Sequence, residues 1–282
     1  DEHQVDVTMG SHAYRRVTGD FNLKTGDSAA LRLNAMSTTA KNDGTGRSLD
    51  KKGVAATYRW GIGERDEFQA SLFHLDNNNG INYGIPFIAP YAGAPATDRR
   101  LLPLDPANYY GAASDYNQSG GTLLGFAHTH RFSHDSELKT QFRYGDFHRD
   151  QRSGAIRLAG AAQQPGGVAA TLENFGPGTV FTRGTHLKVQ DMKNVHLQSD
   201  FSNKFEALGV KHQLMAGVDY SRERKVVYAA RNATQGGVNI TKPTTTVGTP
   251  NDGASRPDTR GTPVLNTFKT TNIGLYAQDT LS

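Results

Sequence analysis

The chain contains no cysteine among its 282 residues. This absence excludes disulfide bonds, thiolate metal sites and cysteine nucleophiles, although it does not fix the compartment in which the protein works. Long apolar runs are absent too, since no stretch approaches the roughly 18 consecutive apolar residues that a transmembrane helix requires. The strands of a membrane β-barrel show only alternate residues to lipid, so a polar average composition remains compatible with such a barrel.

An excess of charge of one sign is also lacking. The 31 basic residues nearly balance 27 acidic ones, which gives a net charge of +4. Without a basic helix, a zinc finger or an aromatic RNA-binding motif, the sequence argues against a nucleic-acid partner. No Ser-His-Asp order, nucleophile elbow or phosphate-binding glycine loop stands in a strand–helix context, so we expect no enzyme.

The two ends of the sequence carry neither a targeting signal nor a turn. The chain begins at Asp1 and ends at Ser282, in both cases within strand-like sequence. A secretory signal would instead show a basic segment followed by an apolar run. We therefore expect residues 1–282 to be a segment of a longer polypeptide and to belong to a single domain.

The stretch from Lys52 to Leu75 predicts a long β-hairpin. Its first arm places alternate residues on one face, namely Val54, Ala56, Tyr58, Trp60 and Ile62. After a turn at 63–66, the second arm continues this apolar face with Phe68, Ala70 and Leu72. An apolar outside over a small or polar inside suits a β-barrel in lipid, with Tyr58 and Trp60 in an aromatic girdle near the turn. A soluble β-sandwich hairpin shows the same alternation, so this hairpin alone leaves both classes open.

The order of the connections decides between these classes. Further strands are expected over residues 4–24, 29–36, 122–132, 138–148, 193–202, 210–228 and 272–279, with a bulge at Gly10 and Ser11. Tight turns near Thr25, Gly63, Ser133 and Asn203 alternate with longer connections over 41–50, 77–119, 151–190 and 229–266. Outer-membrane barrels have short turns on one rim and long loops on the other. The pattern therefore favours an all-β, antiparallel up-and-down transmembrane β-barrel.

Several stretches resemble the TonB-dependent siderophore receptors of the Gram-negative outer membrane. They are VTMGS (7–11) leading into Arg15 and Arg16, ALRLNAM (30–36), NYGIP (82–86), LKTQFRYG (138–145) and NIGLYAQD (272–279). The resemblance implies a barrel of about 22 strands with a plugged lumen, of which this chain would supply roughly nine from the N-terminal half. The family's plug domain and C-terminal strands have no counterpart among these 282 residues.

The resemblance also implies a function. The protein would bind a ferric siderophore at extracellular loops and import it by TonB-dependent active transport. The TonB-ExbB-ExbD complex would act through the plug domain, and outer-membrane lipid would surround the barrel. Iron would arrive inside the siderophore, so we expect no cofactor and no catalytic residue. A passive porin or a substrate-specific outer-membrane channel is the alternative, and a soluble adhesive β protein is a third class.

Aromatic and basic residues gather in the first long loop. The candidates for ligand contact are Tyr83, Tyr91, Arg99, Arg100, Tyr109, Tyr110 and Tyr116. Tyrosine rings offer stacking faces and arginine side chains offer positive charge, which together suit an anionic ferric catecholate. The same residue types also order ordinary surface loops, so a purely structural role stays open.

His128 and His130 share a strand face, which makes a metal pair geometrically conceivable. No further well-spaced ligand accompanies them, and they continue the face of Leu124, Phe126 and Phe132 beside a tight turn. Amphipathic rings at such a position suit the lipid headgroup boundary. The sequence therefore predicts no metal site there.

Two further polar groups stand on the predicted strands. The first lies where a strand becomes a long loop and comprises His148, Arg149, Asp150 and Arg152. It either meets ligand or, as a solvated strand end, stabilises the rim. The second comprises Arg59, Lys139 and Arg143 on the inward face, where we expect contact with the plug rather than with ligand.

Overall fold

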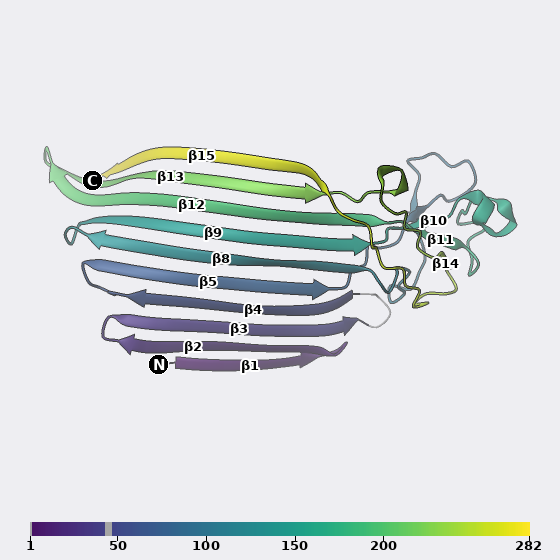
Figure 1. Cartoon of the computed structure of the whole chain (residues 1–282), viewed down its shortest axis with the longest axis horizontal. Coiled ribbons are helices and arrows are strands. Elements are labelled where there is room, and N and C mark those ends of the chain that lie inside the picture. The colour runs from purple at the N-terminus through teal and green to yellow at the C-terminus, as the bar shows by residue number, and fades with distance from the viewer. Residues whose placement is uncertain (1, 43–46) are drawn as a thin grey trace.

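The computed structural model describes residues 2–42 and 47–282, and its main feature is one antiparallel sheet of ten strands (Figure 1). These strands are β1 (Glu2–Gly10), β2 (Tyr14–Gly26), β3 (Ala29–Asn42), β4 (Arg47–Trp60), β5 (Asp66–Asn79), β8 (Tyr116–Arg131), β9 (Ser136–Ser153), β12 (His186–Ala207), β13 (Val210–Tyr228) and β15 (Val264–Leu281). Their spatial order follows the chain, which confirms the predicted all-β, up-and-down arrangement. The sheet is open, with β1 and β15 at its edges. Among the described residues, no helix is long and apolar enough to cross a bilayer.

The pairing register gives the sheet one apolar and one polar face. One cross-strand row consists of Leu33, Ala56, Leu72, Leu124, Tyr144 and Val195. The adjacent row consists of Arg32, Thr57, Ser71, Gly125, Arg143 and His196. Successive residues of a strand point to opposite faces, so the first row lies on the apolar face and the second on the polar face. In a barrel in lipid, these faces are the outside and the lumen respectively.

Aromatic rings gather on the apolar face at the rim of the tight turns. Trp60 stacks on Phe68 at a centroid distance of 5.2 Å, and Phe68 stacks on His128 at 4.4 Å. Tyr58 also stacks on Trp60, at a centroid distance of 5.5 Å. This run of rings is the girdle that the sequence predicted beside the turn, where amphipathic aromatic side chains suit a membrane boundary.

The interpretation of residues 4–24 as one bulged strand is wrong. The chain turns at Ser11–Ala13, and β1 pairs with β2 from Glu2 opposite Asn22 to Gly10 opposite Tyr14. His12 and Ala13 both have positive φ, at 56° and 52°. The sheet therefore has ten strands instead of nine, and the added connection is a short one at the rim of the long loops.

Several strand ends also differ from the prediction. β12 runs on past Asn203 to Ala207, and the tight turn falls at Leu208 and Gly209, both with positive φ. The predicted loop over 41–50 is mostly strand, because β3 and β4 extend into it; its centre, 43–46, lies outside the described residues. Backbone pairing continues beyond the roughly 9–11 residues that span a bilayer, since β12 has 22 residues.

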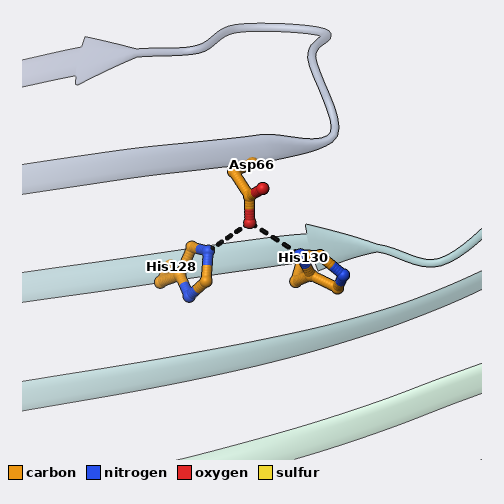
Figure 2. A group of neighbouring side chains, drawn as sticks. All are labelled: Asp66, His128 and His130. Atoms are coloured by element: carbon orange, nitrogen blue, oxygen red, sulfur yellow. Dashed lines mark hydrogen bonds and ion pairs between the residues drawn. The ribbon is translucent and has the colours of Figure 1, made fainter.

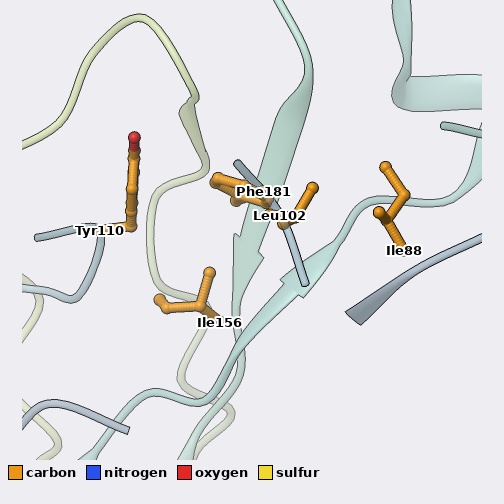
Figure 3. Close-up of a cluster of buried hydrophobic side chains, with 5 residues drawn as sticks. All are labelled: Ile88, Leu102, Tyr110, Ile156 and Phe181. Carbon is orange, nitrogen blue, oxygen red and sulfur yellow. The ribbon is translucent and has the colours of Figure 1, made fainter. Parts of the chain in front are cut away.

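The three long connections fold together at one end of the sheet (Figure 1). We call residues 80–115, 154–185 and 229–263 the loop body. It contains a small sheet of β10 (Ile156–Leu158), β11 (Val180–Arg183) and β14 (Thr245–Thr246), a pair of β6 (Phe87–Ile88) and β7 (Arg100–Leu101), and the 3₁₀ turns η1 (Ala161–Gln163), η2 (Pro165–Gly167) and η3 (Ala233–Gln235). Its apolar core is formed by Ile88, Leu102, Tyr110, Ile156 and Phe181 (Figure 3). The loops are thus a packed structure on the outer rim.

Candidate ligand-binding site at the loop end of the sheet

Arg183 joins all three parts of the loop body. Its side chain is fully buried, and its Nη2 donates to both carboxylate oxygens of Asp252, at 2.7 and 2.8 Å. Its other nitrogens donate to the carbonyl oxygens of Tyr110 at 2.7 Å and Pro243 at 3.0 Å. Burial opposes ionisation of Asp252, but hydrogen bonds from Arg183 and from the Ala254 N–H hold the pKa of this carboxyl below its usual value.

A second buried pair ties the loop body to the start of β8. Lys242 donates to Oδ1 of Asp115, and both side chains are 1% exposed. The other carboxylate oxygen of Asp115 accepts from the Gly154 N–H at 2.8 Å. Residues from all three loops therefore meet at this carboxylate. The contacts fix the loops over the strand ends instead of leaving them free.

The structure separates the seven predicted contact residues into three groups. Tyr83, Tyr91, Arg99 and Arg100 are exposed, Tyr109 and Tyr116 are half-buried, and Tyr110 is buried. Tyr110 is a core residue, because it packs edge-on against Phe181 at 5.1 Å and donates to the Val247 carbonyl. Burial raises the pKa of Tyr109 far above its usual value, so this phenol is neutral at physiological pH.

Among the exposed candidates, only Tyr83 lies against the polar face of the sheet. Its hydroxyl accepts a hydrogen bond from Gln151 Nε2 at 2.6 Å. Its ring packs edge-on against His186 at 4.9 Å. Arg99 caps carbonyl oxygens of its own loop, and Arg100 pairs with Asp98 at 3.0 Å. Tyr83 is therefore the predicted residue that connects the loop body to the lumen side.

The strand register gathers polar side chains around Tyr83. Arg149, Gln151 and Ser153 alternate along β9, and their partners on β12 are Gln190, Lys188 and His186. Because directly paired residues share a face, all six lie on the polar face at its loop end. Arg149 donates to Gln151 and to Asn117 Oδ1, the latter at 3.4 Å. We call Tyr83, Arg149, Gln151, His186 and Lys188 the vestibule cluster.

The vestibule cluster carries excess positive charge. Lys188 is exposed and has no hydrogen bond or ion pair with any described residue. Arg149 and Lys188 both act electrostatically on the ring of His186. Nε2 of His186 is buried without a hydrogen-bond partner in the described chain. An unpaired buried polar atom costs about 1–3 kcal/mol, so this nitrogen marks a position where a ligand oxygen or hydroxyl would be stabilised.

The polar group over 148–152 divides between the two faces. Arg149 joins the vestibule cluster, whereas Arg152 points to the opposite face and donates to the carbonyl oxygens of Asp258 and Arg260 at 2.8 and 3.1 Å. Arg152 also pairs with Asp150 at 3.0 Å. This second half of the group stabilises the rim, as the structural interpretation expected.

The inward-facing cations are farther from the loops. Arg59 and Arg131 both bond the carboxylate of Glu67 on the polar face at the tight-turn rim. Arg143 occupies the polar face between Gly125 and His196. None of these lies in the vestibule cluster. Gln151, His186 and Lys188 were not identified as candidates from the sequence. Extending the alternation of β9 and β12 to the strand ends would have placed them on the same face as Arg143.

The chain matches known receptors over nearly its whole length. Over 284 aligned residues, it is 26% identical to the catecholate siderophore receptor Fiu of Escherichia coli O157:H7, an alignment that covers 98% of this chain and 35% of that protein. It is also 26% identical, over 137 residues, to the probable TonB-dependent receptor BfrD of Bordetella pertussis, covering 48% of this chain and 18% of that protein. The chain thus spans about a third of the length of the Fiu relatives. No protein-family model matches it.

Solved structures show the same fold. The closed form of the ferric-catecholate import receptor Fiu from E. coli K12 superposes with a TM-score of 0.83 at 24% identity, over 99% of this chain and 38% of that one. The siderophore receptor PiuA from Acinetobacter baumannii gives 0.72 at 16% identity, over 99% and 40%. The outer-membrane ferripyoverdine receptor of Pseudomonas aeruginosa gives 0.69 at 16%, over 98% and 34%. As the sequence resemblance predicted, the chain is a β-barrel segment of the kind found in TonB-dependent siderophore receptors of the outer membrane.

Proposed function

We propose that the intact protein is an outer-membrane receptor that binds a ferric siderophore at its loop end and imports it by TonB-dependent active transport. The observation that carries this proposal is the vestibule cluster: unpaired positive charge, an exposed tyrosine and an orphaned imidazole nitrogen on the lumen face, directly below a packed loop body. The similarity to catecholate siderophore receptors over 98% of the chain supports it.

The chemistry of the cluster suits a catecholate chelate. Catecholate oxygens bound to ferric ion leave the complex negatively charged, so Arg149 and Lys188 would attract it and donate to its oxygens. The Tyr83 ring would lie against an aromatic ring of the chelate. Iron is cargo within this ligand, and binding requires no bond to be made or broken. We therefore propose no enzymatic activity, in agreement with the receptor names of the matched proteins.

Transport would need energy from outside this segment. We propose that the TonB-ExbB-ExbD complex acts on parts of the protein beyond residues 1–282, while the sheet and loop body hold and release the chelate. The packed core around Phe181 and the buried Arg183–Asp252 pair support a preformed binding rim, because ordered loops lose less conformational entropy when they bind.

The test uses the intact protein in iron-starved cells. We expect uptake of radioactive iron supplied as a ferric catecholate, and loss of this uptake, with retained surface binding, when TonB is deleted. Uptake that is indifferent to TonB, together with steady conductance of the purified protein in liposomes, would establish the passive channel instead. Absence of affinity for every chelate class would overturn both the ligand and the receptor proposal.

A further inference from the structure

Three potential metal ligands meet on the apolar face at the rim of the tight turns. Asp66 is the first residue of β5, and His130 of β8 is its direct cross-strand partner. His128 pairs with Phe68, two residues along, so it lies diagonal to Asp66 on the same face. Direct and diagonal partners are the neighbours whose side chains can touch across a sheet. The register alone therefore brings one carboxylate and two imidazoles together.

The side chains converge on one oxygen. Oδ1 of Asp66 lies 2.8 Å from Nε2 of His128 and 2.6 Å from Nδ1 of His130. Figure 2 shows both rings directed at this carboxylate from the adjacent strand. All three ligand atoms lie within 4.8 Å of one another. This is the only such group of three or more among the described residues.

Neighbouring aromatic rings fix both imidazoles. His128 stacks on Phe68 at 4.4 Å with an interplanar angle of 8°. His130 meets the Phe132 ring edge-on at 4.7 Å. The three ligands remain partly open, with side-chain exposures of 35% for His128, 25% for His130 and 44% for Asp66. The site is thus ordered by packing and still accessible to an ion from water.

The donor set matches a zinc-type cation. Zinc binds histidine nitrogen and carboxylate oxygen at about 2.0–2.2 Å, and two histidines with one carboxylate leave its fourth position for water. Tetrahedral coordination at these distances separates ligand atoms by about 3.3–3.5 Å, so the present contacts would open by less than about 1 Å. Calcium and magnesium prefer oxygen ligands, so the two nitrogens select against them.

We propose that Asp66, His128 and His130 form a binding site for a divalent transition-metal ion, with Zn²⁺ as its representative. The bound ion would link β5 to β8, and so join two successive hairpins at the rim opposite the loop body. This site is independent of the chelate proposed at the vestibule cluster, because the registers place the two on opposite faces of the sheet. They also lie at opposite ends of the strands, the tight-turn end and the loop end in Figure 1.

The test is calorimetric titration of the intact protein in detergent with ZnCl₂ at pH 7.5. The double variant His128→Gln/His130→Gln should bind one equivalent fewer than the wild type, and Asp66→Asn should weaken that equivalent more than tenfold. His212→Gln is the matched control. His212 also contacts one carboxylate, that of Asp279 at 2.6 Å, and stacks on an aromatic ring, Phe205, but no third ligand joins this pair among the described residues.

A double variant that keeps every zinc equivalent would overturn the proposal, as would a control that loses one. Should the double variant fail to fold, the wild type still decides the question through Cu²⁺ electron paramagnetic resonance. We expect a signal with coupling to two imidazole nitrogens, and we expect Asp66→Asn to retain this nitrogen coupling. Spectra of bound Cu²⁺ with fewer than two coupled nitrogens would contradict the site. Millimolar Mg²⁺ should not displace the ion.

Discussion

The sheet and the loop body are held together in different ways. The sheet depends on continuous backbone pairing, as in the 19 paired positions between β12 and β13, and it leaves large apolar side chains such as Leu124 exposed on one face. The loop body has little regular pairing, and buries Phe181, Arg183 and Asp115 inside itself. The sheet is ordered by repeated backbone pairing, and its apolar face suits contact with lipid. The loop body is ordered by contacts between specific side chains, and its surface suits contact with water.

This difference predicts that one buried arginine matters more to the loops than any residue of the sheet. Arg183→Met would leave Asp252 and the Tyr110 and Pro243 carbonyls without their donor, at a cost of about 3–5 kcal/mol. Hydrogen exchange of the intact protein should show faster exchange throughout the loop body and unchanged β12 and β13. The exposed neighbour Arg157, replaced by methionine, is the control. Equal exchange in both variants would remove the special role of Arg183.

The apolar core of the loop body should be nearly as sensitive. Phe181 is 0% exposed, so Phe181→Ala would leave a cavity and cost about 3–5 kcal/mol. Phe87 is 62% exposed in the same region, and Phe87→Ala should cost less than about 0.5 kcal/mol. Limited proteolysis in the loops separates the two variants. Similar cleavage rates would show that the core around Phe181 does not hold the loops.

The effect of a substitution on the stability of the sheet should depend on which face carries the substituted residue. Leu124 and Leu123 are adjacent on β8 and point to the apolar and polar faces respectively. Leu124→Lys should destabilise the barrel in lipid by about 2–4 kcal/mol, because a cation would then face hydrocarbon. Leu123→Lys should have a much smaller effect, on the order of 0.5 kcal/mol. Denaturant unfolding from vesicles measures both; a reversed order would mean that the faces are assigned the wrong way round.

The smallest expected effect is a loss of stability of the loop body at low pH. Burial raises the pKa of Asp252, but the hydrogen bonds from Arg183 and from the Ala254 N–H, together with the charge of Arg183, outweigh it and hold this pKa below its ordinary value of 3.8. Its contribution to stability is therefore complete above about pH 3.8 and is lost as the pH falls through the lower folded value. Loop exchange should rise on acidification below that value, and less so in Asp252→Asn. Identical acid profiles would exclude this carboxyl as the cause.

Sequence periodicity predicted the sheet well because alternation is a local signal. The faces of β4 and β5 follow directly from the pattern in residues 52–75. The turn at His12–Ala13 was missed because its positive-φ residues are not the glycine or asparagine that usually marks such a turn. The last tight turn was placed near Asn203, although Gly209 beside Leu208 carries that glycine signal. The predicted strands are too short, as for β12, expected over 193–202 and observed over His186–Ala207, because backbone pairing continues where the apolar pattern stops.

The sites depend on contacts that no local pattern encodes. Tyr83 was predicted as a ligand residue, but His186 reaches it only through the pairing of β9 with β12 and the folding of the first loop. The seven loop candidates share only their residue type, and residue type cannot distinguish the buried Tyr110 from the exposed Tyr83. Asp66 lies more than sixty positions from His128, so the third ligand of the histidine pair emerges only from the register.

The most direct test of the proposed receptor is equilibrium binding of a ferric catecholate to the intact purified protein. Arg149→Gln and Lys188→Gln remove positive charge from the vestibule cluster, whereas Lys193→Gln removes it from the opposite face of the same strand as Lys188, where Lys193 pairs with Asp146. The account predicts that each vestibule variant weakens binding about tenfold, as expected for loss of a charge-assisted hydrogen bond, and that Lys193→Gln leaves it unchanged. Equal affinity in all three variants would contradict it.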